Sequence, residues 1–425
     1  MKYIKRIVDD EISLQLKVAG AIQIKGPKWC GKTTSARQVA KSVLELQNPD
    51  LQDNYLELAS TKPSLLLEGD KPRLIDEWQL APKLWNAVRY DIDKTGEYGS
   101  YILTGSAVPI DDDTTKDLHT GVGRFAIVDM KPMTLYESGD SNGKISLYEL
   151  LNGKRDIDGI KTTLGYEQIA TVLCRGGWPN AIGMNEELSA NIARNYLDIL
   201  CQSDISRVDG IKKDPELARA ILRAYARQTS TIDSDKSMYD DVRSNYALVS
   251  EATIASYIKA LKRLYVIEDI EAWNPNIRSK TAIRTSPKKS FVDPSLAVAA
   301  LGCSKKELML DINTFGLLFE NLVGRDLSVY AKKYGGTLRH YRDRYGLECD
   351  NVIHFPDGRY ILAEVKLGGS KLKEAEEHLL ELNRLINESK DIKVKPSLLM
   401  VITGTDMAYV TTTGVLVAPI GCLKD

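Results

Sequence analysis

The sequence lacks several features by which whole classes of protein are recognised. It has six cysteines but no Cys-x-x-Cys pair, which argues against a zinc knuckle and against a disulfide framework. Scattered cysteines of this kind are what we expect of a protein in a reducing cytoplasm. The cysteines are Cys30, Cys174, Cys201, Cys303, Cys349 and Cys422.

Long apolar segments are also missing. No run approaches the roughly 20 residues that are needed to cross a bilayer. The first residues, MKYIKRIVDDEIS, turn acidic without forming an apolar signal core. We therefore expect a cytoplasmic protein with no membrane partner.

Charge of one sign is not in excess. The net charge is −1, so nucleic-acid or membrane binding would have to come from a local patch. Hydrophobic residues make up 43% and charged residues 27% of the chain, which is the profile of a soluble globular protein. A chain of 425 residues is long enough for more than one domain.

The clearest motif lies in GAIQIKGPKWCGKTTSARQVAKSVLEL, where a β-prone run at 21–25 precedes a glycine-bracketed loop. The apolar spacing of 36–43 predicts a helix after the loop. Strand, glycine loop and helix predict a P-loop, whose backbone N–H groups surround phosphate oxygens. Lys32 is expected to reach the β- and γ-phosphates of ATP, and the Thr33 hydroxyl to ligate Mg²⁺. An ordinary glycine turn is the alternative. The expected nucleotide contacts are Gly26, Pro27, Lys28, Trp29, Cys30, Gly31, Lys32, Thr33, Thr34 and Thr104.

A second strand, in PRLIDEWQLAP, ends in two acids. Asp76 is expected to hold a water on Mg²⁺, and Glu77 to orient or deprotonate the attacking water. The alternative is an acidic pair that caps the following helix.

Two further β-prone runs add polar candidates. YGSYILTGS ends in Thr104 and Ser106, placed to sense the γ-phosphate, and TGVGRFAIVDMKP offers Arg124 as an arginine finger. Arg124 as a surface residue is the alternative, and action on a neighbouring subunit's nucleotide also stays open. Polar residues at strand ends predict an open α/β sheet with ligands at the carboxyl edge of its strands. The N-terminal domain is thus predicted to be a P-loop NTPase.

Short motifs in a fixed order resemble those of a known group along nearly the whole chain. They are GPKWCGKTT, LIDEW, ILTGS, GVGRF, RGGWP, YLDILCQSDI, TIASYIKALKRLYVI, KSFVDPSLA, FGLLFENLV and YRDRYGLECDNVI. The chain is similar to prokaryotic AAA-superfamily P-loop ATPases that carry a C-terminal domain of unknown function. The resemblance implies a restriction-endonuclease-like portion, of the PD-(D/E)xK type, in that domain. The polar insert ESGDSNGKISLYELLNGKRDIDG does not match this pattern and is predicted to be a surface excursion.

The middle of the chain is predicted to be helical. Residues 165–206 would form a lid over the nucleotide, with Trp178 in a core role. In LVSEATIASYIKALKRLYVIEDIEAW, a helix with Ser250 as its N-cap precedes a β-prone segment, the outline of a winged helix-turn-helix. The following stretch, RSKTAIRTSPKK, is basic, and is either a nucleic-acid contact or a solvated loop. Its basic residues are Arg278, Lys280, Arg284, Lys288 and Lys289.

The segment ECDNVIHFPDGRYILAEVK predicts a hairpin with a three-residue loop at 356–358. If Phe355 faces Arg359, Asp350 lies opposite Glu364, about 5 Å away at Cβ. Period-two alternation places these acids on one face, with the mostly apolar residues on the other.

Two interpretations of this hairpin stay open. In one, Asp350 and Glu364 bind Mg²⁺ or Mn²⁺, because hard cations prefer oxygen ligands, and Lys366 stabilises charge on a phosphate. This matches the D…E-x-K layout of restriction-endonuclease-like folds, and that resemblance implies a further acid from an upstream helix, here Glu320, with Asp343 as an extra. In the other, Lys366 pairs with Glu348 on an ordinary surface hairpin.

We therefore predict an α/β protein with an AAA-type P-loop ATPase core at 1–164 and a helical lid at 165–206. A winged helix-turn-helix would follow at 207–290 and a restriction-endonuclease-like α/β domain at 291–425. The expected function is Mg²⁺-dependent ATP hydrolysis coupled to binding or cleavage of DNA or RNA by the C-terminal half. Alternatives are an ATP-driven switch that binds DNA or a protein partner without cutting, and a regulatory NTPase without nucleic acid. The oligomeric state stays open.

Overall fold

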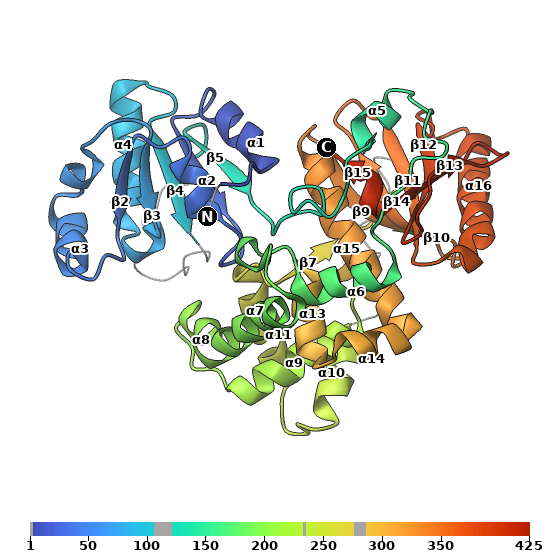
Figure 1. Cartoon of the computed structure of the whole chain (residues 1–425). Helices are drawn as coiled ribbons and strands as arrows, with labels where there is room; N and C mark the ends of the chain where they lie inside the picture. The colour runs from blue at the N-terminus through green and yellow to red at the C-terminus, as the bar shows by residue number, and fades with distance from the viewer. Residues whose placement is uncertain (1–2, 106–120, 233–234, 276–285) are drawn as a thin grey trace. The chain divides into compact units, whose positions relative to one another are not determined.

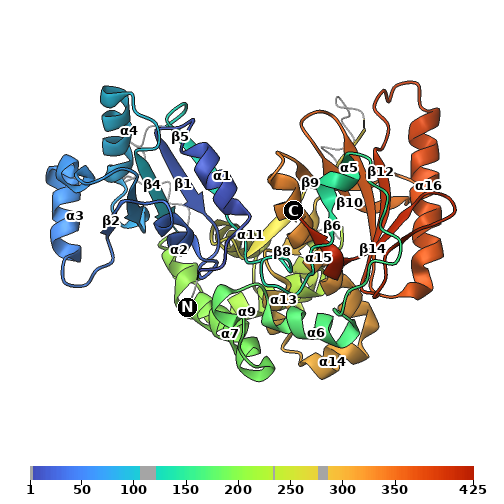
Figure 2. The same cartoon turned by 45° about the horizontal axis from the view of Figure 1, so that its top comes forward.

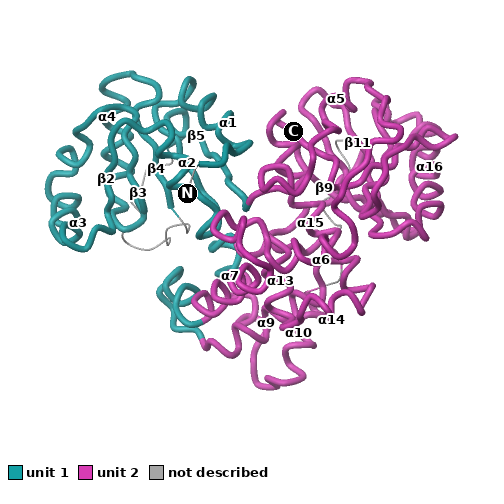
Figure 3. Tube along the Cα trace, in the orientation of Figure 1, with its two compact units in different colours: residues 1–132, 202–213, 259–265 teal, residues 133–201, 214–258, 266–425 magenta. Residues whose placement is uncertain are grey.

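The computed structural model describes residues 3–105, 121–232, 235–275 and 286–425. The chain forms two compact units (Figure 3). Unit 1 consists of residues 1–132, 202–213 and 259–265, and unit 2 of residues 133–201, 214–258 and 266–425. In the described ranges, no helix has the length and apolar character needed to cross a membrane.

Unit 1 is built on a five-stranded parallel sheet (Figure 1). The strand order is β2-β3-β4-β1-β5, so β4 separates the phosphate-loop strand from the strand that ends in Asp76. The strands are β1 (Ala21–Lys25), β2 (Ser42–Glu45), β3 (Arg73–Asp76), β4 (Tyr101–Gly105) and β5 (Phe125–Asp129).

Helices cover both faces of this sheet, as the two apolar cores of unit 1 show. On one face α1 (Val8–Gln15) and α2 (Lys32–Arg37) pack through residues such as Ile12 and Ala36. On the other, α3 (Gln52–Thr61) and α4 (Lys83–Thr95) pack through residues such as Ala59 and Leu84. Alternating side chains of each strand enter the two cores, which accounts for the near-continuous apolar runs in the sequence.

The helix predicted over residues 36–43 is wrong beyond Arg37. α2 ends at Arg37, and Val43 lies in strand β2. Leu44 and Leu46 are 3% and 0% exposed in the α3–α4 core. Their spacing of two residues is the period of a strand, and burial at that period prevails over the helical spacing of the preceding residues.

Unit 2 contains a helical part and a mixed sheet. The helices described before the sheet include α6 (Tyr166–Arg175), α7 (Glu186–Ile199), α9 (Pro215–Arg227), α10 (Asp235–Arg243), α13 (Pro294–Leu301), α14 (Lys305–Leu310) and α15 (Ile312–Lys332). A π-helical segment, Leu200–Asp204, continues α7 and contains the boundary between the units. Trp178 is fully buried, as expected of a core residue.

Helix α11 (Glu251–Arg263) precedes an antiparallel pair, β7 (Ile267–Ile270) and β8 (Lys288–Phe291). Ser250 accepts a hydrogen bond from the Thr253 N–H at 3.1 Å, so the predicted N-cap is present. Helices followed by an antiparallel pair give the element order expected for a winged helix. Most of the connection between the two strands lies outside the described residues.

The C-terminal sheet has the order β13-β14-β12-β11-β10-β9, with α15 and α16 (Leu372–Glu388) on opposite sides of it (Figure 2). Strands β9 to β11 are antiparallel neighbours, whereas β11, β12 and β14 run parallel. The strands are β9 (Thr337–Arg342), β10 (Glu348–His354), β11 (Tyr360–Lys366), β12 (Leu398–Thr403), β13 (Tyr409–Val410) and β14 (Leu416–Pro419).

The polar insert predicted as a surface excursion is part of the fold. Its strand β6 (Ile145–Ser146) pairs in parallel with β15 (Leu423–Lys424) near the C-terminus. The Asp425 carboxylate accepts hydrogen bonds from the Ser146 hydroxyl at 2.7 Å and from the Tyr148 N–H at 2.9 Å. The insert is polar because its serines bond this distant segment, a pairing that local composition does not indicate.

Candidate functional site

The phosphate loop has the backbone that its glycines predict. Gly26 and Gly31 have φ values of 153° and 103°, in the region that side chains disfavour. A Cβ atom on Gly26 would lie 2.0 Å from the Met130 carbonyl oxygen. Arg6 fixes the loop from outside by donating to the Cys30 and Lys131 carbonyls, each at 2.8 Å. The bend is therefore built into the fold.

Lys32 lies inside this loop. Its side chain is 6% exposed, and its ammonium donates to the Gly26 carbonyl at 3.0 Å and to the Pro27 carbonyl at 2.7 Å. These partners are neutral, so they solvate the ammonium without cancelling its charge. The loop thus holds a positive charge where phosphate oxygens are expected to bind.

Three strand and loop ends bring oxygen atoms together beside Lys32. The Asp76 carboxylate, 3% exposed, accepts hydrogen bonds from the Thr33 hydroxyl at 2.8 Å and from the Thr104 hydroxyl. Asp76 pairs with Thr104 in the β3–β4 register, which sets this contact. Carboxylate and hydroxyl oxygens suit Mg²⁺, so the donor set fits the expected cation.

Glu77 follows Asp76 in a left-handed backbone conformation, with φ 55°. A non-glycine residue with positive φ is uncommon and is often a functional position. The conformation turns the chain at the strand end, and the Gln79 side-chain amide donates to the Glu77 carboxylate. Glu77 is therefore held at the carboxyl edge of the sheet, next to Asp76.

The remaining loop residues differ in their surroundings. Cys30 is fully buried, whereas Trp29 is 43% exposed and has a positive φ of 63°. Thr34 is exposed on α2. Lys28 pairs with Asp204 at 2.7 Å, and the Asp204 side chain is 8% exposed. The sequence analysis missed this pair, because the partners are far apart in the chain.

Arg124 is not brought to the phosphate loop of its own chain. It directly precedes β5, whose start is paired with the start of β1, at the opposite edge of the sheet from the loop. Its guanidinium bonds Asp93 at 2.6 Å, with 45% of the Arg124 side chain exposed. A role on this chain's own nucleotide is therefore incompatible with the fold. Ser106 lies outside the described residues.

The C-terminal hairpin has the predicted register. Ile353 pairs with Ile361, Asn351 pairs with Ala363, and the Phe355 N–H donates to the Arg359 carbonyl at 2.9 Å. The tight loop fixes this register, as expected from its length.

The hairpin is nevertheless not a surface feature. Six of the seven residues of β11, Tyr360–Val365, are buried, and Glu364 is 2% exposed. Both faces of β11 are therefore buried, because β11 is an inner strand with neighbours on both edges and helices over both faces. Glu348 pairs with Arg342 at 3.1 Å, and the predicted Glu348–Lys366 pair is replaced by other contacts.

Three of the predicted residues converge. Lys366 lies 2.7 Å from Glu364 and 3.5 Å from Asp350, and Asp350 also accepts from the Val365 N–H at 2.8 Å. Burial raises the pKa of Glu364 to about 8, with repulsion from Asp350 as a second cause.

Glu320, the predicted upstream acid, lies on α15 and is bonded by Lys288 at 2.6 Å. The Lys288 ammonium also donates to the Asp350 backbone carbonyl. Burial raises the pKa of Glu320 to about 7, and Lys288 opposes this rise. The sequence analysis assigned Lys288 to an exposed basic stretch, whereas its side chain is 5% exposed.

The carboxylates of this cluster, Glu320, Asp350 and Glu364, are thus already bonded to two lysines and a backbone N–H. In the described ranges, no group of three His, Cys, Asp or Glu side chains is arranged to hold a metal ion. Oxygen donors are present, but ammonium groups lie among them. This arrangement does not fit the predicted Mg²⁺ or Mn²⁺ site. Asp343 accepts from the Tyr345 and Leu347 N–H groups in the β9–β10 turn, as an ordinary turn residue.

The basic stretch is only partly described. Lys288 and Lys289 are buried, and Lys289 lies 3.5 Å from Asp235. Arg278, Lys280 and Arg284 lie outside the described residues. Two of the five basic residues, Lys288 and Lys289, therefore have buried side chains and do not form an exposed contact surface.

A buried ion network links several motifs of unit 2. Arg325 on α15, 2% exposed, bonds Asp293 at 2.8 Å and Asp326 at 2.7 Å. Asp293 accepts from the Gly177 N–H and Asp326 from the Leu135 N–H, each at 2.9 Å. One guanidinium and its two carboxylates thus connect α15 with the start of α13 and with the backbone at Gly177 and Leu135.

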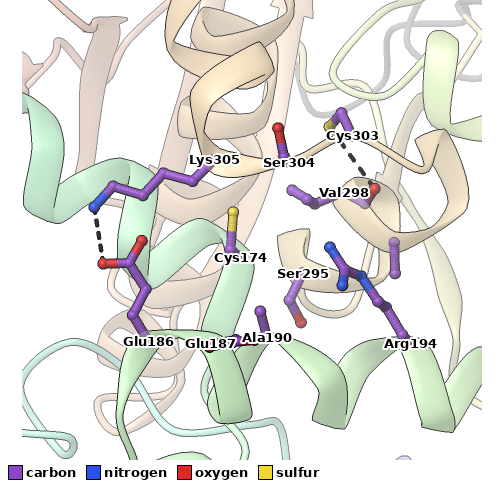
Figure 4. A pocket seen from close by; sticks show the side chains of 11 residues that line it. Cys174, Glu186, Glu187, Ala190, Arg194, Ser295, Val298, Cys303, Ser304 and Lys305 are labelled. Atoms are coloured by element: carbon purple, nitrogen blue, oxygen red, sulfur yellow. Dashed lines mark hydrogen bonds and ion pairs between the residues drawn. The ribbon is translucent and has the colours of Figure 1, made fainter.

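Unit 2 also contains a pocket of ≈ 270 Å³ between α6, α7, α13 and the start of α14 (Figure 4). Lys305 spans one side of it by its ion pair with Glu186 at 2.9 Å. Two cysteines line it, and burial raises the pKa of Cys174 to about 12, so that thiol stays protonated near neutral pH. No predicted site residue lines this pocket.

Three family models match successive parts of the chain. Residues 18–138 match a family model described as an AAA domain. Residues 166–307 and 315–423 match two models of domains of unknown function, DUF8612 and DUF4143. A search of curated protein sequences found no match.

Two solved structures are similar over most of their length. A Walker-type ATPase of Pyrococcus abyssi is 13% identical, with 70% of this chain and 96% of that chain covered and a TM-score of 0.44. The Orc1 protein of Aeropyrum pernix, solved in complex with DNA, is 13% identical, with 69% and 91% covered and a TM-score of 0.25. These scores are too low to define the arrangement of the whole chain. The family match and the loop geometry together show that the N-terminal part of this chain is a P-loop ATPase domain of the AAA type.

Proposed function

We propose that the chain binds and hydrolyses ATP with Mg²⁺ at the phosphate loop, and that its nucleotide state controls nucleic-acid binding by its C-terminal half. One observation carries the first part of this proposal. The Lys32 ammonium, the Thr33 hydroxyl and the Asp76 carboxylate meet at one strand edge, beside a loop whose backbone is already bent.

Each residue has a distinct role in the proposed reaction. Backbone N–H groups of the loop and the Lys32 ammonium bind the β- and γ-phosphates and offset the negative charge that develops on them. Thr33 and Asp76 would hold Mg²⁺, which supplies further charge neutralisation when bound. Thr104 keeps the Asp76 carboxylate oriented through its hydrogen bond.

Glu77 is the proposed general base. A water attacks the γ-phosphorus, its proton passes to the Glu77 carboxylate, and the bond to the β-phosphate oxygen breaks to release ADP and phosphate. The backbone turn at Glu77 and the bond from Gln79 support this role, because both fix the carboxylate at the strand edge.

Phosphate release by Glu77→Gln tests this assignment. Glutamine keeps the hydrogen-bonding shape but does not accept a proton, so we expect ATP binding to persist while turnover falls about 100-fold. Gln79→Ala serves as a milder variant that should lower turnover less, since it removes only the contact that positions Glu77. Turnover of Glu77→Gln equal to that of the parent would rule out Glu77 as the base.

A second candidate function is metal-dependent cleavage of DNA or RNA by the C-terminal sheet. The convergence of Asp350, Glu364 and Lys366 on the predicted hairpin register favours it. The two lysines among the acids favour the alternative, a nuclease-like domain that binds DNA or a protein without cutting. Incubation of the full chain with DNA and RNA in Mg²⁺ or Mn²⁺ separates them: cleavage that Asp350→Ala abolishes supports the first, and binding without cleavage supports the second.

Nucleic-acid contact itself depends on the basic stretch. With Lys288 and Lys289 buried, we assign the contact to Arg278, Lys280 and Arg284. Replacing these three residues by alanine should weaken DNA binding at low salt and reduce its dependence on salt concentration, because fewer counterions are released. Unchanged binding would show that the contact surface lies elsewhere.

A further inference from the structure

The acidic cluster of unit 2 contains a cation of its own, the side chain of Lys288. Its ammonium bonds the Glu320 carboxylate at 2.6 Å and also donates to the backbone carbonyl of Asp350. Glu320 comes from α15 and Asp350 from β10, so one ammonium bridges two elements that would have to contribute oxygen ligands to a shared metal ion.

Lys366 supplies the second ammonium group of this cluster. It lies 2.7 Å from Glu364 and 3.5 Å from Asp350, both of which are largely buried. A divalent cation placed among these carboxylates would lie beside two ammonium groups in a region with little water, where repulsion between like charges is strong. The Lys288 ammonium takes the position between Glu320 and Asp350 that a shared metal ion would need, so Lys288 and the metal ion exclude one another.

The strand that carries Lys288 is fastened along the same helix. The Asn321 amide donates to the Ser290 hydroxyl at 2.8 Å and to the Phe291 carbonyl at 2.9 Å. Asn321 directly follows Glu320 on α15, so β8 is bonded to two consecutive residues of this helix. Lys288 is thus held in the cluster by the packing of its own strand.

Polar atoms beside the cluster are not fully bonded. Within the described residues, Asn321 Oδ1 and Asn351 Nδ2 have no hydrogen-bond partner, although these residues are 2% and 1% exposed. Buried polar groups without partners are rare and call for an explanation. They adjoin Glu320 and Asp350 in the sequence, so both predicted ligand positions have an incompletely satisfied neighbour.

We propose that Lys288 is a gating cation, which occupies the position of a divalent cation in this cluster and keeps the cluster metal-free. The inference rests on the second candidate function, since it concerns the same acids. The cluster binds a divalent cation only when Lys288 leaves it. β7, the partner strand of β8, begins at Ile267, two residues after Tyr265 of unit 1, so the chain connects unit 1 to this strand pair through a short segment.

Binding of Mn²⁺ alone, measured by electron paramagnetic resonance on the full chain without nucleotide, tests the proposal. Every variant carries Asp76→Asn, which removes the carboxylate ligand of the phosphate-loop site. Lys288→Met keeps the length of the side chain but removes its charge, and we expect it to gain one Mn²⁺ per chain with at least about tenfold tighter binding than the parent. Lys289→Met, which alters the adjacent buried lysine paired with Asp235, should gain none.

Added to Lys288→Met, Asp350→Asn should abolish the gained site, which would place the ion among these acids. A folded Lys288→Met that gains no Mn²⁺ would overturn the proposal. If Lys288→Met does not fold, Mn²⁺ binding by the parent protein, which retains Lys288, is the deciding measurement. Binding that Asp350→Asn removes would overturn the proposal, and absence of binding would support it. This assay measures metal binding without nucleic acid, and cleavage is measured in a separate incubation. A lack of cleavage there would count against the second candidate function and would leave the metal-binding result unaffected.

Discussion

The two candidate sites hold their carboxylates in opposite ways. In the phosphate-loop site, Asp76 is bonded by the neutral hydroxyls of Thr33 and Thr104. In the C-terminal cluster, Glu320 and Glu364 are bonded by the ammonium groups of Lys288 and Lys366. A hydroxyl has lone pairs and can itself become a ligand of Mg²⁺, whereas an ammonium has none. The same type of acid is therefore prepared for a metal ion in unit 1 and neutralised by the protein in unit 2.

The largest effect is expected from Lys32→Ala, which would confirm that unit 1 is the nucleotide site. Removing the ammonium deprives the β- and γ-phosphates of their buried positive partner, so ATP turnover should fall by about 10² to 10³-fold. Phosphate release measures it, and Lys41→Ala, an exposed lysine beyond α2, is the matched control. Turnover equal to that of the control would contradict the assignment of the phosphate loop as the nucleotide site.

Arg325→Met should produce the next largest effect, on unit 2. It would leave Asp293 and Asp326 buried without their shared cation, at a cost of about 3–5 kcal/mol in the free energy of unfolding. Chemical denaturation followed by fluorescence measures this change. Arg384→Met removes an exposed arginine that pairs with Glu381 and Glu388, and it should change the free energy of unfolding far less than Arg325→Met does, because exposed ion pairs contribute little to stability.

A smaller effect concerns pH. The pKa of Glu364 is raised to about 8 and that of Glu320 to about 7 in the folded state. At a pH between the pKa values of the unfolded chain and these raised values, the folded state therefore binds more protons than the unfolded state. The contribution of these acids to stability is therefore present at low pH and is lost as the pH rises toward 8. Glu364→Gln should reduce the fall in melting temperature between pH 5 and about 8. A slope equal to the parent's would show that Glu364 titrates normally.

The smallest effect is expected from Arg124→Ala. Its exposed ion pair with Asp93 contributes less than about 1 kcal/mol, and its position at the far edge of the sheet leaves ATP affinity unchanged. If Arg124 instead acts on the nucleotide of a second chain, turnover will fall and will depend on protein concentration. Phosphate release at several concentrations distinguishes these outcomes.

Local features of both sites could be predicted from the sequence. The glycine loop, Thr33 and Asp76 follow from short motifs, and the pairing of Asn351 with Ala363 follows from the length of one turn. In each case the determinants lie within a few residues of one another, so that backbone geometry alone sets the result.

Long-range features could not be predicted in the same way. Lys288 lies in a basic stretch that suggests exposure, and only the packing of β8 against α15 buries it. Arg124 seemed close to the phosphates because it precedes a strand, but the parallel direction of β5 puts that end of the strand at the far edge. The burial of Lys288 and the position of Arg124 depend on which segments of the chain become neighbours in the fold. The periodicity of apolar residues does not indicate which segments these are.

The number of metal ions bound per chain tests the contrast between the two sites most directly. The wild-type chain would be titrated with Mn²⁺ in the presence of a saturating, non-hydrolysable ATP analogue, with bound ions counted by electron paramagnetic resonance. We predict one Mn²⁺ per chain, lost in Asp76→Asn and unaffected by Asp350→Asn. Two ions per chain, one of them lost in Asp350→Asn, or none at all, would contradict this account.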